Sequence, residues 1–65
     1  MLKVELVKYP IEITIVDKLV LFMIYHYIDT IDSLIKMKDK DIEELEGFEP
    51  SILEAIHIIR GIELN

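Results

Sequence analysis

The most distinctive stretch of the chain is residues 45–56, which read LEGFEPSILEAI. It holds the residues that typically end one helix and begin the next. Gly47 suits the left-handed conformation that often follows a helix C-terminus. Pro50 suits the first turn of a helix, where a backbone N–H group has no partner to lose. The stretch therefore predicts the end of a helix, a tight apolar turn and the start of a second helix.

Helical patterns extend outward from this turn in both directions. From the spacing of apolar residues we expect helices over residues 18–27, 31–36, 39–46 and 50–60. Asp17 and Thr30 are residue types that cap the first two of these helices, and Gly61 is expected to end the last one. The tail, residues 62–65, is expected to pack back on the core. The predicted fold is all-α, a small bundle of four to five short helices.

The first 14 residues show a different pattern. Residues 2–7 alternate apolar and polar side chains, and residues 11–16 do so again at first, which is typical of strands. Pro10 separates the two runs because it removes a backbone donor and fixes φ. We expect a short N-terminal arm or short strands over residues 1–14, followed by a helical domain over residues 15–65.

The composition limits the class of protein. The 65 residues suffice for one small domain, 52% of them are hydrophobic and 31% are charged. These values are typical of a folded domain rather than of a disordered or membrane-spanning chain. Cysteine is absent, so disulfides and thiolate metal sites are excluded. The apolar run at residues 19–28 has about half the length of a membrane span, and no signal-peptide pattern is present. We expect a cytoplasmic protein without membrane contact.

The charge is unfavourable for binding phosphates. Acidic residues outnumber basic ones 13 to 7, for a formal net charge of −6, whereas domains that grip nucleic acid usually carry the opposite sign. The acids are densest over residues 39–49. The simplest interpretation is a solvated helix face, and the alternative is an acidic surface that docks a basic partner or imitates DNA.

The predicted helix at residues 18–27 is apolar on every side. Such a helix is expected to be buried nearly all round, but a domain of this size can cover only part of it. We expect either the N-terminal arm or a second chain to cover the rest.

Few residues suggest a chemical site. His26 and His57 lack a histidine neighbour at helical spacing, so packed or half-exposed side chains are favoured over metal ligands. Tyr25 and Tyr27 lack the basic neighbours of single-strand binders, which favours a core or interface role. No paired carboxylates in a pocket, catalytic triad or glycine-rich phosphate loop is recognisable. We therefore expect no enzyme, no cofactor, no metal site and no small-molecule substrate.

The order of these segments resembles the C-terminal domain of the bacterial RNA polymerase alpha subunit. Residues 30–36 (TIDSLIK) resemble that family's turn into its second helix, and residues 39–42 (DKDI) resemble its next helix start. Residues 47–56 (GFEPSILEAI) are similar to its hairpin, and residues 61–64 (GIEL) to its ending. The resemblance implies a bundle of four or five short helices with a helix-hairpin-helix core. It also implies a domain that docks in the DNA minor groove near promoters and contacts transcription factors.

Most DNA-contacting positions of that family are altered here. Lys18 keeps a cation, but Leu21 and Ile52 stand where the family has an asparagine and a serine. Glu49 replaces the hairpin glycine, and residues 50–51 (PS) replace two lysines. Each lost phosphate contact removes about one unit of salt dependence. DNA binding through Lys18, Ser51 and the hairpin N–H groups from Glu49 to Ile52 is therefore the disfavoured alternative.

The same substitutions predict an apolar, acid-rimmed protein interface at Leu21, Phe22, Ile52 and Glu49. Burial of these side chains in the core stays open as the competing interpretation. We expect a non-enzymatic interaction module related to transcription, with a protein of the transcription machinery or a second copy of itself as partner. Two alternatives remain: a weak minor-groove and backbone DNA-binding domain, and a self-associating accessory subunit unrelated to transcription.

Overall fold

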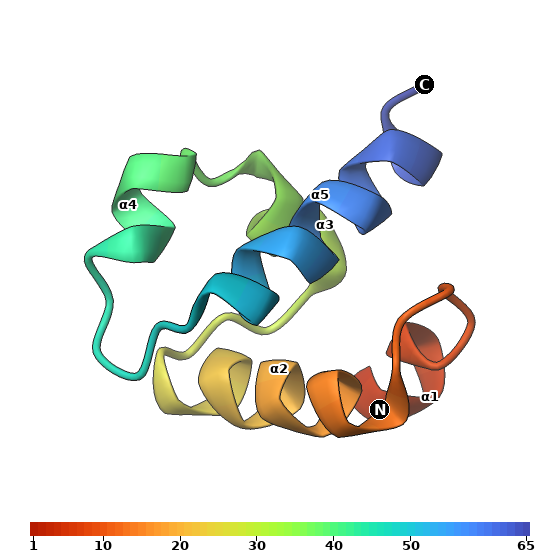
Figure 1. The fold of residues 1–65 in the computed structure, drawn as a ribbon, viewed down its shortest axis with the longest axis horizontal. Helices are drawn as coiled ribbons and strands as arrows, with labels where there is room; N and C mark the ends of the chain where they lie inside the picture. The colour runs from red at the N-terminus through yellow and green to blue at the C-terminus, as the bar shows by residue number, and fades with distance from the viewer.

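The computed structural model describes all residues from 1 to 65. It contains five helices and no strand. In chain order these are α1 (Leu2–Leu6), α2 (Ile13–Tyr25), α3 (Ile31–Lys36), α4 (Asp39–Glu43) and α5 (Pro50–Glu63). Helix α5 packs against α2, α3 and α4, while α1 packs against α2 (Figure 1). The prediction of an all-α bundle is confirmed.

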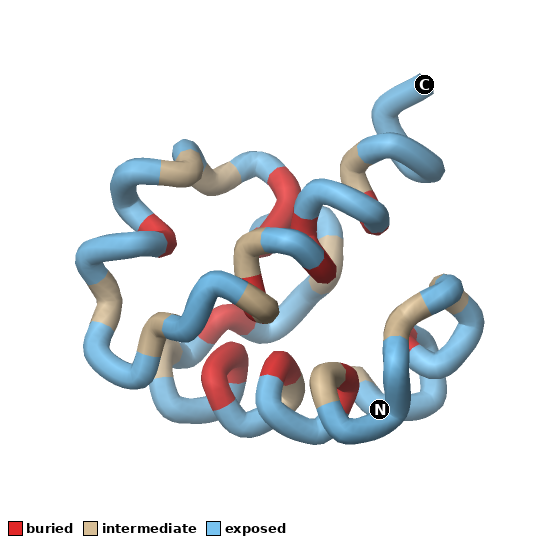
Figure 2. Tube along the Cα trace, in the orientation of Figure 1, coloured by how far each residue is buried: buried red, intermediate tan, exposed pale blue.

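The core lies mainly between α2 and α5, whose buried segments face each other (Figure 2). All 13 buried residues are hydrophobic. In both long helices they recur at the three- and four-residue spacing that places side chains on one helix face. Helix α2 contributes Val16, Leu19, Phe22 and Met23, and α5 contributes Ile52, Ala55, Ile56 and Ile59. Full burial of one such side chain stabilises the fold by roughly 1.5–3 kcal/mol.

Three local signals are confirmed by the structure. The Thr30 hydroxyl caps α3 by accepting a hydrogen bond of 3.0 Å from the backbone N–H of Ser33. Gly47 has a φ of 86°, a conformation that side chains with a Cβ atom rarely adopt. Pro50 occupies the first turn of α5.

The N-terminal strand prediction is wrong, because residues 2–6 form helix α1. Leu6 is fully buried in the common core, and the Lys3 ammonium pairs with the Asp17 carboxylate on α2 at 2.9 Å. A helix satisfies its own backbone groups, whereas a strand needs a paired neighbour. No such neighbour exists in this all-helical chain. The segment therefore covers part of α2 as a helix.

Helix α2 also begins earlier than the pattern indicated. It starts at Ile13 with Glu12 at the N-cap, so Asp17 lies inside the helix instead of capping it. It ends at Tyr25, and Tyr27 adopts a positive φ of 56°. Asp17 is half exposed on α2 and pairs there with Lys3 of α1.

The two later helices differ from the prediction at their C-terminal ends. Helix α4 ends at Glu43 rather than at residue 46. Helix α5 continues through Gly61 to Glu63, because nothing at Gly61 forces the chain to turn. Ile62 and Leu64 are 52% and 61% exposed, so the prediction that the tail packs back on the core is wrong. None of the helices combines the length and apolar character needed to cross a bilayer.

Candidate functional site

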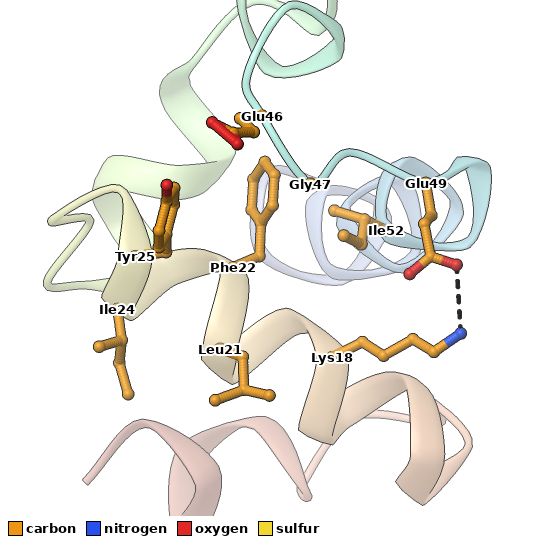
Figure 3. Close-up of a pocket in the computed structure, with 9 residues that line it drawn as sticks. All are labelled: Lys18, Leu21, Phe22, Ile24, Tyr25, Glu46, Gly47, Glu49 and Ile52. Atoms are coloured by element: carbon orange, nitrogen blue, oxygen red, sulfur yellow. Dashed lines mark hydrogen bonds and ion pairs between the residues drawn. The ribbon is translucent and has the colours of Figure 1, made fainter.

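A groove opens between the C-terminal half of α2 and the start of α5 (Figure 3). Its volume is about 550 Å³, within the usual range for binding pockets. We call it the α2–α5 groove and define it by its nine lining residues: Lys18, Leu21, Phe22, Ile24, Tyr25, Glu46, Gly47, Glu49 and Ile52. All four residues of the predicted protein interface belong to this set, and so does Lys18.

The floor of the groove is part of the hydrophobic core. Phe22 is 5% exposed and Ile52 is 1% exposed, which corresponds to the competing interpretation that placed both in the core. Their burial follows from the packing of α2 on α5, since each occupies the inward face of its helix. These two side chains give the groove an apolar base but offer a partner little surface.

The exposed wall of the groove is a patch on α2. Leu21, Ile24 and Tyr25 are 67%, 60% and 63% exposed. Residues three and four apart lie next to each other on a helix, so the three side chains form one apolar patch. Single exposed apolar residues are normal on protein surfaces, but a contiguous group often marks an interaction site.

An ion pair spans one end of the groove. The Lys18 Nζ lies 3.2 Å from Glu49 Oε1, joining α2 to the residue that precedes α5 (Figure 3). Both side chains are half exposed, and such pairs typically contribute about 0–1 kcal/mol. The Glu49 carboxylate thus lies beside Lys18, the one cation kept among the positions that contact DNA in the similar family. Ser51 does not line the groove.

His26 fixes the opposite end of the groove. Its Nε2–H donates to the backbone carbonyl of Glu46 at 2.6 Å, which ties the loop before α5 to the end of α2. The imidazole ring also makes edge-to-face contacts with Phe22 and Tyr25, at centroid distances of 4.7 and 5.0 Å. The Glu46 carboxylate lies at this end (Figure 3) and forms no ion pair.

The other histidine belongs to a separate polar cluster. His57 Nε2 lies 2.8 Å from Asp39 Oδ2, and Arg60 donates to the second oxygen of that carboxylate. Hydrogen bonding from Arg60, and then from His57, holds the pKa of Asp39 below its usual value of 3.8. No three metal-binding side chains gather at one point. Tyr27 is 89% exposed and lies outside the groove.

The sequence-based prediction did not assign four of the nine lining residues to this site: Ile24, Tyr25, Glu46 and Gly47, the last of which was predicted only as a turn residue. Ile24 and Tyr25 follow Leu21 by three and four positions, so a helical projection from Leu21 contains the signal for both. Glu46 carried no such signal, because its position depends on the His26 contact.

No family model, curated protein or solved structure matches the chain. The resemblance to the polymerase alpha subunit therefore stays a prediction, and the function is argued from the groove.

Proposed function

We propose that this chain is a non-catalytic interaction domain that docks a partner protein in the α2–α5 groove. The observation that carries the proposal is the patch of Leu21, Ile24 and Tyr25, exposed side by side over a buried apolar floor. Removing apolar surface from water is favourable by about 25 cal/mol per Å². A partner that covers this patch gains that free energy without any rearrangement of the core.

The surroundings of the patch favour a protein over DNA. Lys18 is already paired with Glu49, and the unpaired Glu46 carboxylate lies at the other end of the groove. A DNA backbone placed here would meet two carboxylates and one cation, which together carry a net negative charge. A place in the transcription apparatus is supported only by the resemblance in sequence.

Site-specific photo-cross-linking in the source cell tests the proposal. A photoreactive phenylalanine analogue at Tyr25 lies in the groove, and the same analogue at Tyr27 is a matched control, because both tyrosines are exposed but only Tyr25 lines the groove. We expect a cross-linked product with a different protein from position 25 but not from position 27. The substitution Leu21→Ser is expected to abolish the product.

Two results would overturn the proposal. One is equal cross-linking from both positions, and the other is no product with a different protein from position 25. A fluorescence titration with AT-rich duplex DNA provides the second arm. We expect no binding at physiological salt, whereas sub-micromolar binding abolished by Lys18→Ala would favour the DNA-binding alternative.

A further inference from the structure

We propose that the α2–α5 groove also accepts a second copy of this chain, through antiparallel pairing of the two α2 helices about a two-fold axis. The inference rests on the proposed function only in using the same groove. In this dimer the Lys18 side chain of each copy reaches the Glu46 carboxylate of the other. The dimer and the complex with a partner protein would therefore exclude each other.

The two ends of the exposed patch carry opposite charges. Lys18 lies at one end of the exposed apolar side chains, and Glu46 lies at the other end, beside Tyr25 (Figure 3). Lys18 and Tyr25 are seven residues apart on α2, about 10 Å along the helix axis. Antiparallel pairing centred near Leu21 and Phe22 superposes the basic end of each copy on the acidic end of the other.

This arrangement of the two copies is self-complementary. A two-fold axis requires one surface to match itself, so that each contact occurs twice. Leu21 of one copy meets the centre of the other patch, and the Lys18–Glu46 contact forms at both ends. The Glu46 carboxylate has no ion-pair partner within its own chain, and Lys18 is half exposed, so its ammonium can contact Glu46 of the other copy while it remains near Glu49.

An all-helical chain also restricts the way in which a second copy can dock. The chain contains no strand, so a second copy cannot add to a sheet edge. The most apolar exposed helix face belongs to α2 itself, which fits the helix-in-groove mode of recognition. The exposed patch of Leu21, Ile24 and Tyr25 is small, and interfaces that bury less than about 1,200 Å² belong to weak complexes. Repulsion between two chains of net charge −6 weakens the dimer further.

Sedimentation equilibrium of the full chain tests the inference, over protein concentrations from about 10 µM to about 1 mM. We expect a reversible monomer–dimer equilibrium whose dimer fraction rises toward the upper concentrations. Leu21→Glu is expected to abolish the dimer. Ile58→Glu is the matched control, because Ile58 is also exposed and apolar but lies outside the groove.

Charge reversal then tests the specific pairing. Glu46→Lys and Glu44→Lys change the net charge equally, and only Glu46 lines the groove. If net charge alone governs association, both variants strengthen the dimer. Our geometry instead predicts that Glu46→Lys weakens it about tenfold, because two ion pairs become repulsive contacts. The double variant Lys18→Glu/Glu46→Lys is expected to restore it, and thermal melting followed by circular dichroism verifies folding of each variant.

Several outcomes separate this inference from the proposed function. A monomer at every concentration, or a dimer that survives Leu21→Glu, overturns the inference but leaves the cross-linking proposal standing. Equal strengthening by both lysine substitutions likewise overturns the antiparallel pairing. A dimer with the predicted charge dependence, combined with no cross-link to a different protein, supports the inference and overturns the proposed function.

Discussion

The surroundings of α5 differ between its two ends. At its start, the α2–α5 groove leaves Leu21 and its neighbours on α2 in contact with water, beside a half-exposed ion pair. Near its end, Arg60 donates hydrogen bonds to the carbonyls of Ile35 and Met37 and to the Asp39 carboxylate. The first end exposes apolar surface, and the second satisfies polar groups between α3, α4 and α5. The comparison indicates that polar contacts join α3, α4 and α5 at the Arg60 end, whereas the groove end combines a buried apolar floor with an exposed wall that is available for binding.

The largest expected change in the free energy of unfolding distinguishes a residue of the groove floor from a residue of its wall. Ile52→Ala removes a 1% exposed side chain from the core, and such truncations destabilise proteins by about 2–5 kcal/mol. Leu21→Ala is the matched control, because Leu21 is 67% exposed and surface changes usually stay within about 0.5 kcal/mol. Urea unfolding followed by circular dichroism measures both. Similar losses for the two variants would show that the wall also stabilises the isolated chain.

The next effect compares the two basic side chains that pair with carboxylates. Arg60→Met leaves the carbonyls of Ile35 and Met37 without their donor, and we expect a loss of about 2 kcal/mol, since hydrogen bonds to charged groups contribute roughly 1.5–3 kcal/mol. Lys18→Met removes one exposed ion pair and is expected to change the free energy of unfolding by less than about 1 kcal/mol. If Lys18→Met proves the more damaging substitution in urea unfolding, the contrast between the two ends fails.

The smallest effect is the pH dependence of the Arg60 end. Because Arg60 and His57 lower the pKa of Asp39 in the folded state, the stabilisation is present above the pKa of the unfolded chain. It is lost as the pH falls from about 4 through the folded pKa. The stability difference between the wild type and Asp39→Asn should therefore shrink on acidification below about pH 4. Asp29→Asn is the control, since Asp29 is exposed and forms no ion pair. Unfolding is measured at a series of pH values. A stability difference between the wild type and Asp39→Asn that stays constant with pH would contradict the lowered pKa of Asp39.

Local signals in the sequence were reliable at Thr30, Gly47 and Pro50, but they failed at Asp17 and Gly61, which lie inside α2 and α5. Thr30, Gly47 and Pro50 act through a side-chain cap, a permitted left-handed conformation and a fixed φ, and none of these needs a distant partner. Patterns whose outcome depends on packing against another segment were also unreliable. Alternation over residues 2–7 indicated a strand, but the segment forms a helix that packs on α2.

The candidate site was predicted in part. Leu21, Ile52 and Glu49 were predicted to form a site because they differ from the DNA-contacting residues of the similar family. The structure brings these three positions together in one groove. The sequence did not distinguish the exposed Leu21 from the buried Ile52. Both are apolar residues on apolar helices, and their exposure depends on the rotation of α2 against α5. That rotation results from the packing of the whole core.

The sequence by itself determined a helical bundle over residues 15–65, because its apolar residues recur there at helical spacing and several caps and turn residues act locally. Only the tertiary structure decided which apolar side chains remain in water and which charges meet. The approach of Lys18 to Glu49 and of His26 to the Glu46 carbonyl joins residues far apart in the chain. Such contacts arise once the helices have packed, and no periodicity along the sequence encodes them.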